Sequence, residues 1–442
     1  MNAPENVGIA AGHAADTLRY QTGFLNEHMS EALAGALPHG RNLPQHPPHG
    51  LYPEQMNATS FTAPRADNLR SWMYRIYPTA AAQAAWERLP MPQLDESGVS
   101  AASPSRYRWA PWPVPDAATD FIDGLTRVAH CGGAAHQAGM SLYAYGVNRP
   151  MQRVFCDFDG ELLLLPQVGT LRLVTEMGRL DVGPGEIALL PRAMRVRVEL
   201  RDAQSRGFVC ENLGNHFRLP ERGVVGANGL ANERDFLIPH AAYEIDDRPV
   251  ELVGKYAGQT WRSELKRSPF DVVAWHGRWA PCKYDMRRFN AMNTVTYDHP
   301  DPSLFCALSS PSGQPGVANV DFCILPPRWL VADNTFRPPF HHRNAMSEIL
   351  ISLVGTPEAR GGHYEVGTST LHNAFAPHGP DPEVIERASN AVLQPKFEDT
   401  LMIMFETRLP FTVSDTALAA PNRAKDYERN WERTPPRFAK PA

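Results

Sequence analysis

Two histidines and one glutamate in the last quarter of the chain have the types and spacing of a metal-binding triad. His342 and Glu348 lie in the stretch Phe336–Glu348, and His378 follows in the segment Pro377–Asp381. Two imidazoles and one carboxylate can occupy one face of a metal ion and leave other positions open, which is the ligand set of non-haem Fe(II) oxygenases. The same ligands also bind catalytic zinc, so these residue types alone do not select the metal.

The spacing between His342 and Glu348 restricts how the chain runs between them. A straight strand would place them roughly 20 Å apart at ~3.3 Å per residue, and a helix would turn them about 240° away from each other. Neither arrangement lets both side chains reach one metal, whose donor atoms lie only ~2 Å from it. We therefore predict that the chain turns back at Arg343–Asn344, and that Glu348 starts a returning buried strand, Ile349–Val354, that ends at Gly355. Such a site is expected at the mouth of a β-barrel.

Other histidines near the triad are weaker candidates. On spacing alone, His341 could replace its neighbour His342 as a ligand. His299 stands in an Asp-His-Pro turn, where it can either cap the turn or take part in chemistry. We interpret His363 and His372 as structural residues or residues at the rim of the site.

The surrounding sequence has the pattern of a mainly β protein. Proline (41) and glycine (32) are frequent, and they separate short apolar runs, which is typical of sandwiches and barrels with long loops. Residues 152–200 give the clearest signal, starting with one run over Val154–Leu165, and have the cadence of a cupin barrel without a histidine at the expected ligand position. Further strands are predicted within 292–330, including Thr294–Tyr297, whereas 205–285 is predicted to be irregular.

The predicted fold is therefore mainly β, with cupin-like or jelly-roll β-barrels in two domains, long irregular loops and few helices. We expect residues 1–19 to be a flexible N-terminus and 20–287 an N-terminal β domain whose cupin-like barrel is a metal-free scaffold. Residues 288–442 are expected to form a C-terminal cupin-like domain that carries the metal site. The best-marked helix is predicted between Asp381, a good N-cap followed by proline, and Pro395.

Composition limits the class of protein. The chain has 442 residues, a net charge of −5 and no basic run, so nucleic-acid binding has no electrostatic support. No signal peptide is visible, and no apolar run approaches the ~20 residues of a membrane helix. The six cysteines are dispersed without a CxxC motif, as is typical of reduced, mostly buried thiols. These features predict a cytoplasmic protein with no nucleic-acid or membrane partner.

Segments distributed from Tyr20 to about Asp415 resemble the homogentisate 1,2-dioxygenase family. They are Tyr20–Phe24, Phe61–Arg65, Gly226–Asn232, Val272–Gly277, Leu325–Leu330, His342–Glu348 and Pro377–Asp381. So many irregular loop segments in one order are more specific than a metal motif alone. The resemblance implies a cupin-like two-domain fold, Fe(2+) as the cofactor, ring cleavage by O2, and a homo-oligomer that is a hexamer built as a dimer of trimers.

The resemblance also implies roles for single residues. His342, Glu348 and His378 match the iron ligands of the family. The family pattern places an aromatic residue at position 341, so we interpret His341 as a neighbour of the site. His299 matches a catalytic histidine that accepts a phenolic proton and orients the ring, a role that suits an imidazole near neutral pH.

Between Glu348 and His378 the chain departs from the family pattern, most clearly over 349–370. The tyrosine through which the family contacts its substrate would fall at Pro357, which has no hydroxyl, and the family's lysine would fall near Arg360, which keeps a cation. We expect Tyr364 to be a candidate for supplying the missing hydroxyl. The predicted substrate-binding residues are Phe340, Arg360, Tyr364 and His378.

The expected activity is the Fe(II)-dependent opening of the homogentisate ring by O2 to give maleylacetoacetate, a step of tyrosine and phenylalanine breakdown. The same chemistry on another hydroquinone or gentisate-like acid stays open, because a missing hydrogen-bond partner changes substrate choice by orders of magnitude. Two alternatives come from other classes: a cupin that binds a small acid or phenol without redox chemistry, and a zinc hydrolase.

Overall fold

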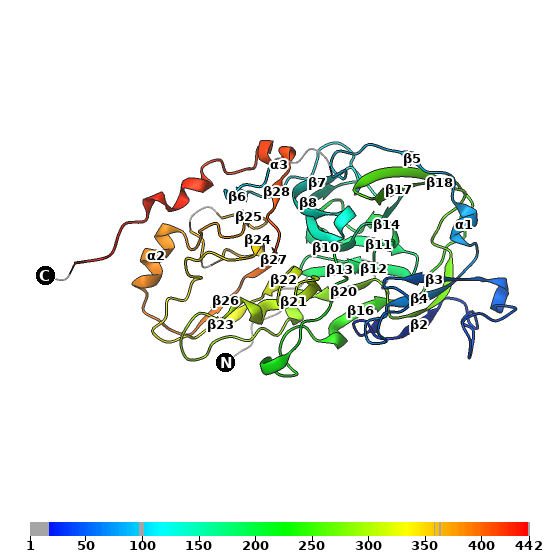
Figure 1. The fold of residues 1–442 in the computed structure, drawn as a ribbon, viewed down its shortest axis with the longest axis horizontal. Helices are drawn as coiled ribbons and strands as arrows, with labels where there is room; N and C mark the ends of the chain where they lie inside the picture. Colours follow the sequence, from blue (N-terminus) through cyan, green and yellow to red (C-terminus); the bar gives the residue numbers. More distant parts are fainter. Residues whose placement is uncertain (1–16, 97–100, 358, 362–363, 441–442) are drawn as a thin grey trace.

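Strands dominate the computed structural model of the protein, which describes residues 17–96, 101–357, 359–361 and 364–440. The α-helices of these residues are short: α1 (Thr79–Ala82), α2 (Pro382–Ser389) and α3 (Asp415–Ala419). None of them is long and apolar enough to cross a membrane. The predicted mainly β fold with few helices is confirmed (Figure 1).

A nine-stranded sheet forms the middle of the molecule. In spatial order its strands are β1 (Tyr20–Thr22), β16 (Phe236–Pro239), β20 (Cys282–Asp285), β13 (Glu186–Leu190), β10 (Glu161–Val168), β15 (Ser205–Asn212), β8 (Ala138–Val147), β7 (Leu125–Gly133) and β28 (Thr412–Val413). The sheet is apolar on both faces: Leu163 and Leu165 belong to one core cluster, whereas Leu162 and Leu164 belong to another. This alternation shows that the sheet is covered from both sides.

A seven-stranded sheet covers one face of the nine-stranded sheet. Its order is β12 (Gly178–Val182), β11 (Leu171–Thr175), β14 (Arg195–Leu200), β9 (Val154–Asp157), β17 (Val250–Tyr256), β18 (Gln259–Leu265) and β5 (Glu87–Arg88). Leu171, Leu173 and Val196 pack in one cluster with Leu162 and Leu164 of β10. The two sheets therefore form the N-terminal β-sandwich.

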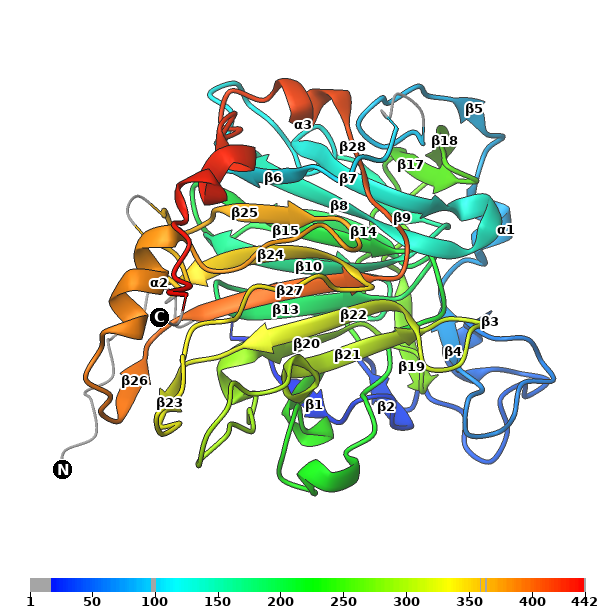
Figure 2. The ribbon, with the colours of Figure 1, turned by 60° about the vertical axis from the view of Figure 1, so that its left-hand side comes forward.

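A six-stranded sheet covers the other face and carries the predicted metal ligand Glu348. Its order is β21 (Cys306–Pro311), β22 (Ala318–Leu325), β27 (Leu401–Thr407), β24 (Ser347–Val354), β25 (Ser369–His372) and β6 (Arg106–Trp109). Ile349, Ile351 and Phe405 share a buried cluster with Leu163 and Leu165 of β10. Figure 2 shows this sheet stacked in front of the nine-stranded one.

Two smaller sheets complete the fold. One is four-stranded, in the order β2 (His28–Glu31), β19 (Val272–Gly277), β4 (Arg70–Arg75) and β3 (Tyr52–Asn57), and the other pairs β23 (Arg328–Leu330) with β26 (Lys396–Glu398). Two strands also cross between the halves of the chain. β6 pairs with β25 in the C-terminal sheet, and β28 pairs with β7 in the central sheet.

The structure corrects three local predictions. Residues 205–285 contain six strands, β15 to β20, rather than being irregular throughout. Strands such as β18 alternate buried and exposed residues and so contain no continuous apolar run. The run Val154–Leu165 divides into β9 and β10 at a turn in which Asp157 accepts hydrogen bonds from the backbone N–H groups of Asp159 (2.9 Å) and Gly160 (3.0 Å). Thr294–Tyr297 is an irregular loop, and its apolar side chains face solvent instead of a sheet.

The helix α2 begins at the predicted proline, with Asp381 at the N-cap position, but ends at Ser389 rather than at Pro395. The Asp381 side chain makes no cap hydrogen bond in the described structure. It accepts hydrogen bonds from the Arg360 side chain (3.2 Å) and the Gly361 backbone N–H (3.0 Å) instead. The N-cap residue therefore connects this helix to the segment in which the chain departs from the family pattern.

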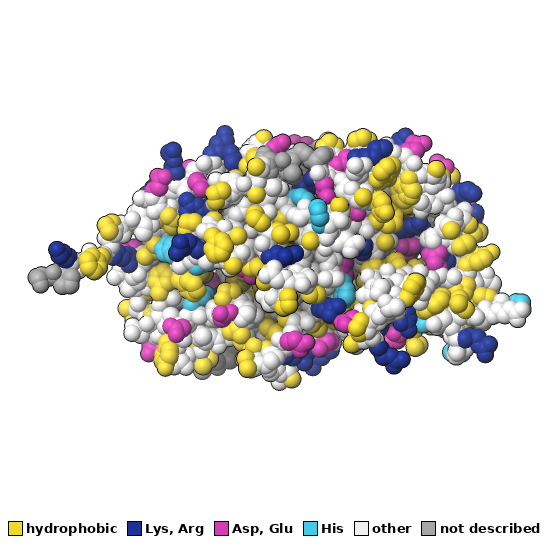
Figure 3. Space-filling model, in the orientation of Figure 1, with side chains coloured by type: hydrophobic (Ala, Val, Ile, Leu, Met, Phe, Trp, Pro, Cys, Tyr) yellow, Lys and Arg dark blue, Asp and Glu magenta, His cyan; other side chains and the backbone are white. Residues whose placement is uncertain are grey.

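Charged side chains are mixed on the face shown in Figure 3. Basic and acidic groups are interspersed over that face, and neither sign gathers into a single large patch.

We expect His130 on β7 to make stability depend on pH. Burial and the nearby Arg127 lower the pKa of His130 to about 4, below the ~6.5 of the unfolded chain. Below pH 6.5 the unfolded state therefore binds a proton that the folded state excludes, and stability falls with pH. At 1.36 kcal/mol per pH unit, the loss between pH 6.5 and 5 is about 2 kcal/mol.

Denaturant unfolding of the wild type and of His130→Asn at pH 7 and pH 5 measures this effect. The wild type should lose about 2 kcal/mol more than the variant over that interval. Parallel losses in the two proteins would remove His130 as the source.

Candidate metal centre

The three predicted ligands converge from one strand and two loops. Glu348 lies on β24, His342 precedes that strand, and His378 lies in the loop between β25 and α2. The two histidine loops are joined directly: the His342 N–H donates to the His378 carbonyl (2.9 Å), and the His378 N–H donates to the His342 carbonyl (3.2 Å). This reciprocal backbone pair fixes the spacing of the two imidazoles.

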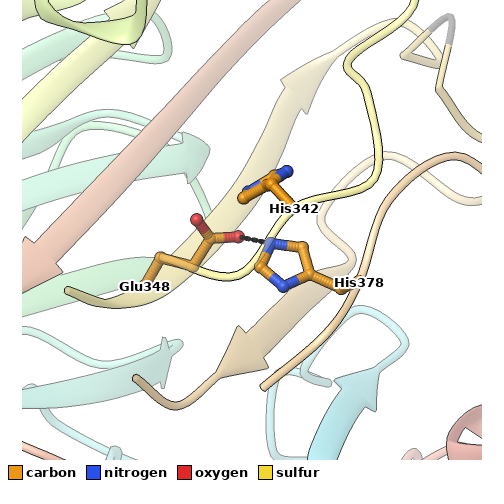
Figure 4. A group of neighbouring side chains, drawn as sticks. All are labelled: His342, Glu348 and His378. Atoms are coloured by element: carbon orange, nitrogen blue, oxygen red, sulfur yellow. Dashed lines mark ion pairs between the residues drawn. The ribbon is translucent and has the colours of Figure 1, made fainter. Parts of the chain in front are cut away.

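The donor atoms of His342, Glu348 and His378 all lie within 4.8 Å of one another. Figure 4 shows the two rings and the carboxylate pointing toward one another, with His378 Nε2 at 2.8 Å from Glu348 Oε1. As predicted, the chain turns back before β24, and Asn344 accepts a hydrogen bond from the backbone N–H of Met346 (3.2 Å) in that turn. The predicted returning strand also matches β24 and ends before Gly355.

The two imidazoles are oriented as metal ligands require. His342 Nδ1 lies 2.9 Å from the Phe340 carbonyl, and His378 Nδ1 lies 2.9 Å from the Ala376 carbonyl. Each ring therefore carries its proton on Nδ1, which leaves Nε2 as the basic nitrogen. The buried Nε2 atom of His378 faces the Glu348 carboxylate and, among the described residues, has no other polar partner at hydrogen-bond distance. A buried imidazole nitrogen beside a carboxylate and a second imidazole fits a divalent cation.

Electrostatics keep the carboxylate charged. Burial pushes the pKa of Glu348 upward, but hydrogen bonds with His342, His372 and His378 outweigh it and hold that pKa well below its usual value. The hydrogen bond with Glu348 raises the pKa of His342 in turn. The centre is therefore a buried anion with imidazoles around it, an environment that favours a bound cation.

His372, which the sequence indicated only as a structural or rim residue, contacts the carboxylate of the centre directly. It stands opposite Glu348 in the β24–β25 ladder, with Nδ1 at 2.9 Å from Glu348 Oε1 and Nε2 at 3.0 Å from the hydroxyl of Tyr427. Burial lowers the pKa of His372 to about 3, so the ring is neutral. A neutral ring that donates to the carboxylate accepts from the tyrosine hydroxyl. The chain Tyr427–His372–Glu348 thereby orients the carboxylate.

The metal centre opens onto a cavity of about 880 Å³. The cavity face of β24 presents Glu348 and Leu350, while the alternate residues Ile349 and Ile351 face the core. The neighbouring strands β22 and β27 follow the same alternation, and their cavity-facing residues are Asp321, Cys323, Leu325, Met402, Met404 and Glu406.

Two acids on this wall were also missed from the sequence. Glu406 stands opposite Glu348 in one ladder and opposite Asp321 in the next. Burial, with the charges of Glu348 and Asp321, raises the pKa of Glu406 to about 7, and burial raises the pKa of Asp321. Asn344 donates a hydrogen bond to Glu406 (2.8 Å). Cross-strand register, which no local pattern encodes, is the signal that places them beside the centre.

The predicted histidines other than the ligands take different positions. His299 lines the cavity, with its ring edge-on to Phe340 at 5.8 Å, and Phe340 is edge-on to His342 at 5.6 Å. His341 is exposed beside Gly379 and does not join the ligand cluster. His363 lies outside the described residues.

The predicted substrate contacts divide into two groups. Phe340, Arg360 and His378 line the cavity, and so does Pro357. Tyr364 does not: it is buried behind the wall, with the Arg108 guanidinium 5.6 Å from its ring centre and its hydroxyl without a hydrogen-bond partner among the described residues. The structure therefore does not bring Tyr364 into the cavity as a replacement hydroxyl.

The sequence matches two family models along nearly its whole length. The model described as "Homogentisate 1,2-dioxygenase N-terminal" matches residues 19–286, and the corresponding C-terminal model matches residues 287–438. A homogentisate 1,2-dioxygenase of Pseudomonas fluorescens is 49% identical over 426 residues, which cover 96% of this chain and 98% of the relative. One of Pseudomonas putida is 49% identical over 422 residues, which cover 95% and 97%.

Solved structures similar to this chain include a cupin 2 conserved barrel domain protein from Leptotrichia buccalis, with 9% identity, a TM-score of 0.26 and coverage of 62% of this chain and 84% of that one. A mutant oxalate decarboxylase from Bacillus subtilis has 8% identity, a TM-score of 0.28 and coverage of 73% and 80%. Because these TM-scores are low, the solved structures carry no argument about the fold, which is described from its own sheets.

We expect His372→Phe to weaken metal binding by about 10- to 100-fold, the usual cost of removing a group that orients a ligand. The phenyl ring preserves most of the volume but cannot donate to Glu348. Tyr427→Phe removes only the outer hydroxyl and should cost less. Competition with a chelator measures Fe(II) affinity, and His341→Asn is the matched control on an exposed neighbour. Wild-type affinity in His372→Phe would show that Glu348 needs no support from β25.

Proposed function

The chain belongs to the homogentisate 1,2-dioxygenase family, and we propose that it opens the aromatic ring of homogentisate with O2 to give maleylacetoacetate, in tyrosine and phenylalanine breakdown. The observation that carries this proposal is the convergence of His342, Glu348 and His378 on a cavity that also contains His299. Three ligands on one side of a cavity leave the other side for a ring and for O2.

We propose Fe(2+) as the cofactor, held by His342, Glu348 and His378. The donor set also fits zinc, and membership of a dioxygenase family favours iron because zinc has no redox chemistry. Bound Fe(II) would supply the redox chemistry with O2 and a Lewis acid for a phenolate. The protein's contribution is to hold the carboxylate through His372 and to keep both imidazole Nε2 atoms directed at the centre.

His299 is the proposed base. Its Nδ1 lies 3.0 Å from the Arg337 carbonyl, so the ring is protonated there and Nε2 is its basic nitrogen. The two hydroxyls of homogentisate are para to each other, so the substrate cannot chelate a metal through adjacent oxygens. A histidine that takes a phenolic proton at neutral pH and orients the ring is therefore useful. Phe340, between His299 and His342, offers a flat wall for that ring.

Arg360 is the proposed partner of the substrate carboxylate. It lines the cavity, and its terminal nitrogen donates to the Gly379 carbonyl and to Asp381, both at 3.2 Å. Its Nε atom is buried and makes no hydrogen bond with the described residues. A guanidinium that is fixed by two hydrogen bonds and has a further N–H donor can bind a carboxylate.

A close second candidate is the same ring cleavage on another hydroquinone or gentisate-like acid. Pro357 lines the cavity where a hydroxyl is expected, and Tyr364 lies behind the wall. A cavity that lacks one hydrogen-bond partner accepts a different ring more readily.

We also propose a cytoplasmic homo-hexamer built as a dimer of trimers. Loops near the cavity expose Val224, Val295 and Tyr297, and apolar side chains of this kind support an interface with another copy of the chain.

Within each copy we propose a domain boundary near residue 287, where the two family models meet. In the N-terminal half, the Lys255 ammonium pairs with the carboxylates of Asp159 and Glu211. This cation takes the place that a metal ion would need, which supports a metal-free scaffold there.

Anaerobic Fe(II) loading followed by O2-electrode and ultraviolet assays tests the activity. We expect stoichiometric O2 uptake with homogentisate and little with gentisate or unsubstituted hydroquinone. Uptake with a different ring would keep the iron chemistry and change the substrate. Bound iron without uptake on any of them would favour a ligand-binding cupin, and retention of zinc with indifference to O2 would favour a hydrolase.

We expect His299→Asn to lower kcat by about 10²- to 10⁴-fold, the usual contribution of a positioned acid–base group, without loss of iron. Steady-state rates with homogentisate and the iron content of the same preparation measure both effects, with His341→Asn as the control. An unchanged rate would dismiss His299 as the base, and a loss of iron would show that it supports the metal instead.

A further inference from the structure

Two of the six cysteines stand opposite each other in the wall of the cavity. Cys306 on β21 and Cys323 on β22 form a directly opposed pair in an antiparallel ladder, and both line the cavity. Each of the other four, Cys131, Cys156, Cys210 and Cys282, faces a residue other than cysteine in the ladders of the described residues. The pairing is therefore particular to the cavity wall.

The geometry of this pair matches what a disulfide needs. Directly opposed residues in an antiparallel ladder have Cα atoms about 4.5–5.5 Å apart and side chains on the same face of the sheet. A disulfide needs Cα atoms about 4.4–6.8 Å apart. The two thiols also interact, and a hydrogen bond between them is the largest cause of the raised pKa of Cys323. In the structure both thiols are reduced.

The two cysteines differ in accessibility. Cys323 is buried beside Phe305 and Met404, whereas Cys306 is only partly buried. The Cys306 thiol donates a hydrogen bond to the Asp321 carboxyl (3.9 Å). A partly accessible thiol next to a buried partner is the arrangement of an attacked cysteine and a resolving cysteine.

We propose that Cys306 and Cys323 are a redox-active pair, which a peroxide oxidises to a reversible disulfide that slows turnover. Hydrogen peroxide oxidises the Cys306 thiol to a sulfenic acid and releases water. The Cys323 thiol then attacks that sulfur, the S–S bond forms, and a second water leaves. A dithiol returns two electrons and two protons and restores both thiols.

The link to turnover comes from what the cross-link joins. The segment from His299 runs through a short 3₁₀ turn, Pro302–Phe305, into Cys306 at the start of β21. Cys323 lies on β22, two residues beyond Asp321 on the same cavity face. A bond between the sulfurs draws them to about 2.05 Å and ties the start of β21, into which the His299 segment leads, to β22. Small displacements of catalytic groups cost large factors in rate.

The test uses the iron-loaded enzyme treated anaerobically with diamide, a thiol oxidant that takes up the two hydrogens of a thiol pair. Denaturing thiol titration should fall from the six free cysteines by two, and peptide mass mapping should find Cys306 joined to Cys323 with the loss of two hydrogen atoms. Homogentisate turnover should fall on the order of tenfold or more and recover with dithiothreitol while the iron content stays constant.

In Cys306→Ser and in Cys323→Ser, diamide should leave the turnover rate nearly unchanged. Cys282→Ala, on the central sheet, is the control and should lose turnover as the wild type does. Six thiols after treatment, or a cross-link between other cysteines, would overturn the proposal, and a mapped disulfide with unchanged turnover would overturn its effect on the site. The effect on turnover rests on the proposed function. An untreated enzyme that never consumes O2 would overturn that function alone, because mass mapping reads the disulfide independently.

Discussion

The buried carboxylate of Glu348 is the group around which the site is arranged. Taking a carboxylate out of water costs several kcal/mol unless partners compensate it. Three imidazoles do so here, from His342, His372 and His378. Two of them belong to loops joined by a reciprocal backbone pair, and the third belongs to the adjacent strand. The same electrostatic demand that keeps the carboxylate charged therefore brings the two proposed nitrogen ligands to the same point.

The period of two along the strands connects this site to the packing of the core. On β24 the odd-numbered Ile349 and Ile351 pack against the central sheet, while Glu348 and Leu350 face the cavity. A slip of one residue would exchange these sets and move the carboxylate from the imidazoles into the apolar core. Because two isoleucines would be exposed by the same slip, hydrophobic packing specifies the register. The core thereby fixes the position of the metal ligand without touching the metal site.

Local sequence was sufficient for features that depend on neighbouring residues. The turn between His342 and Glu348, the strand that follows and the short strands between residues 170 and 200 are all present. Local sequence was insufficient to predict contacts between residues that are distant in the chain. Nothing near His372 or Glu406 indicates that each stands opposite Glu348, because that follows from strand register. The long resemblance placed the ligands, but it did not show that β6 and β28 cross between the halves, which depends on tertiary pairing.

The ligand frame and the divergent segment are held by different contacts, and this explains how one can change without the other. His342, Glu348 and His378 are fixed by the β24–β25 ladder and the paired loops, whereas the segment carrying Pro357 and Arg360 is a loop against the cavity. One link remains. Asp381, only three residues after His378, is buried and takes hydrogen bonds from Arg360 and the Gly361 N–H. Without Arg360, the remaining cation near this buried carboxylate would be the more distant Arg108 guanidinium (3.7 Å), and the ligand loop would be destabilised. The ion pair with Asp381 therefore favours a cation at position 360 while the residues around it vary, and arginine meets this demand while presenting a broad donor to the cavity.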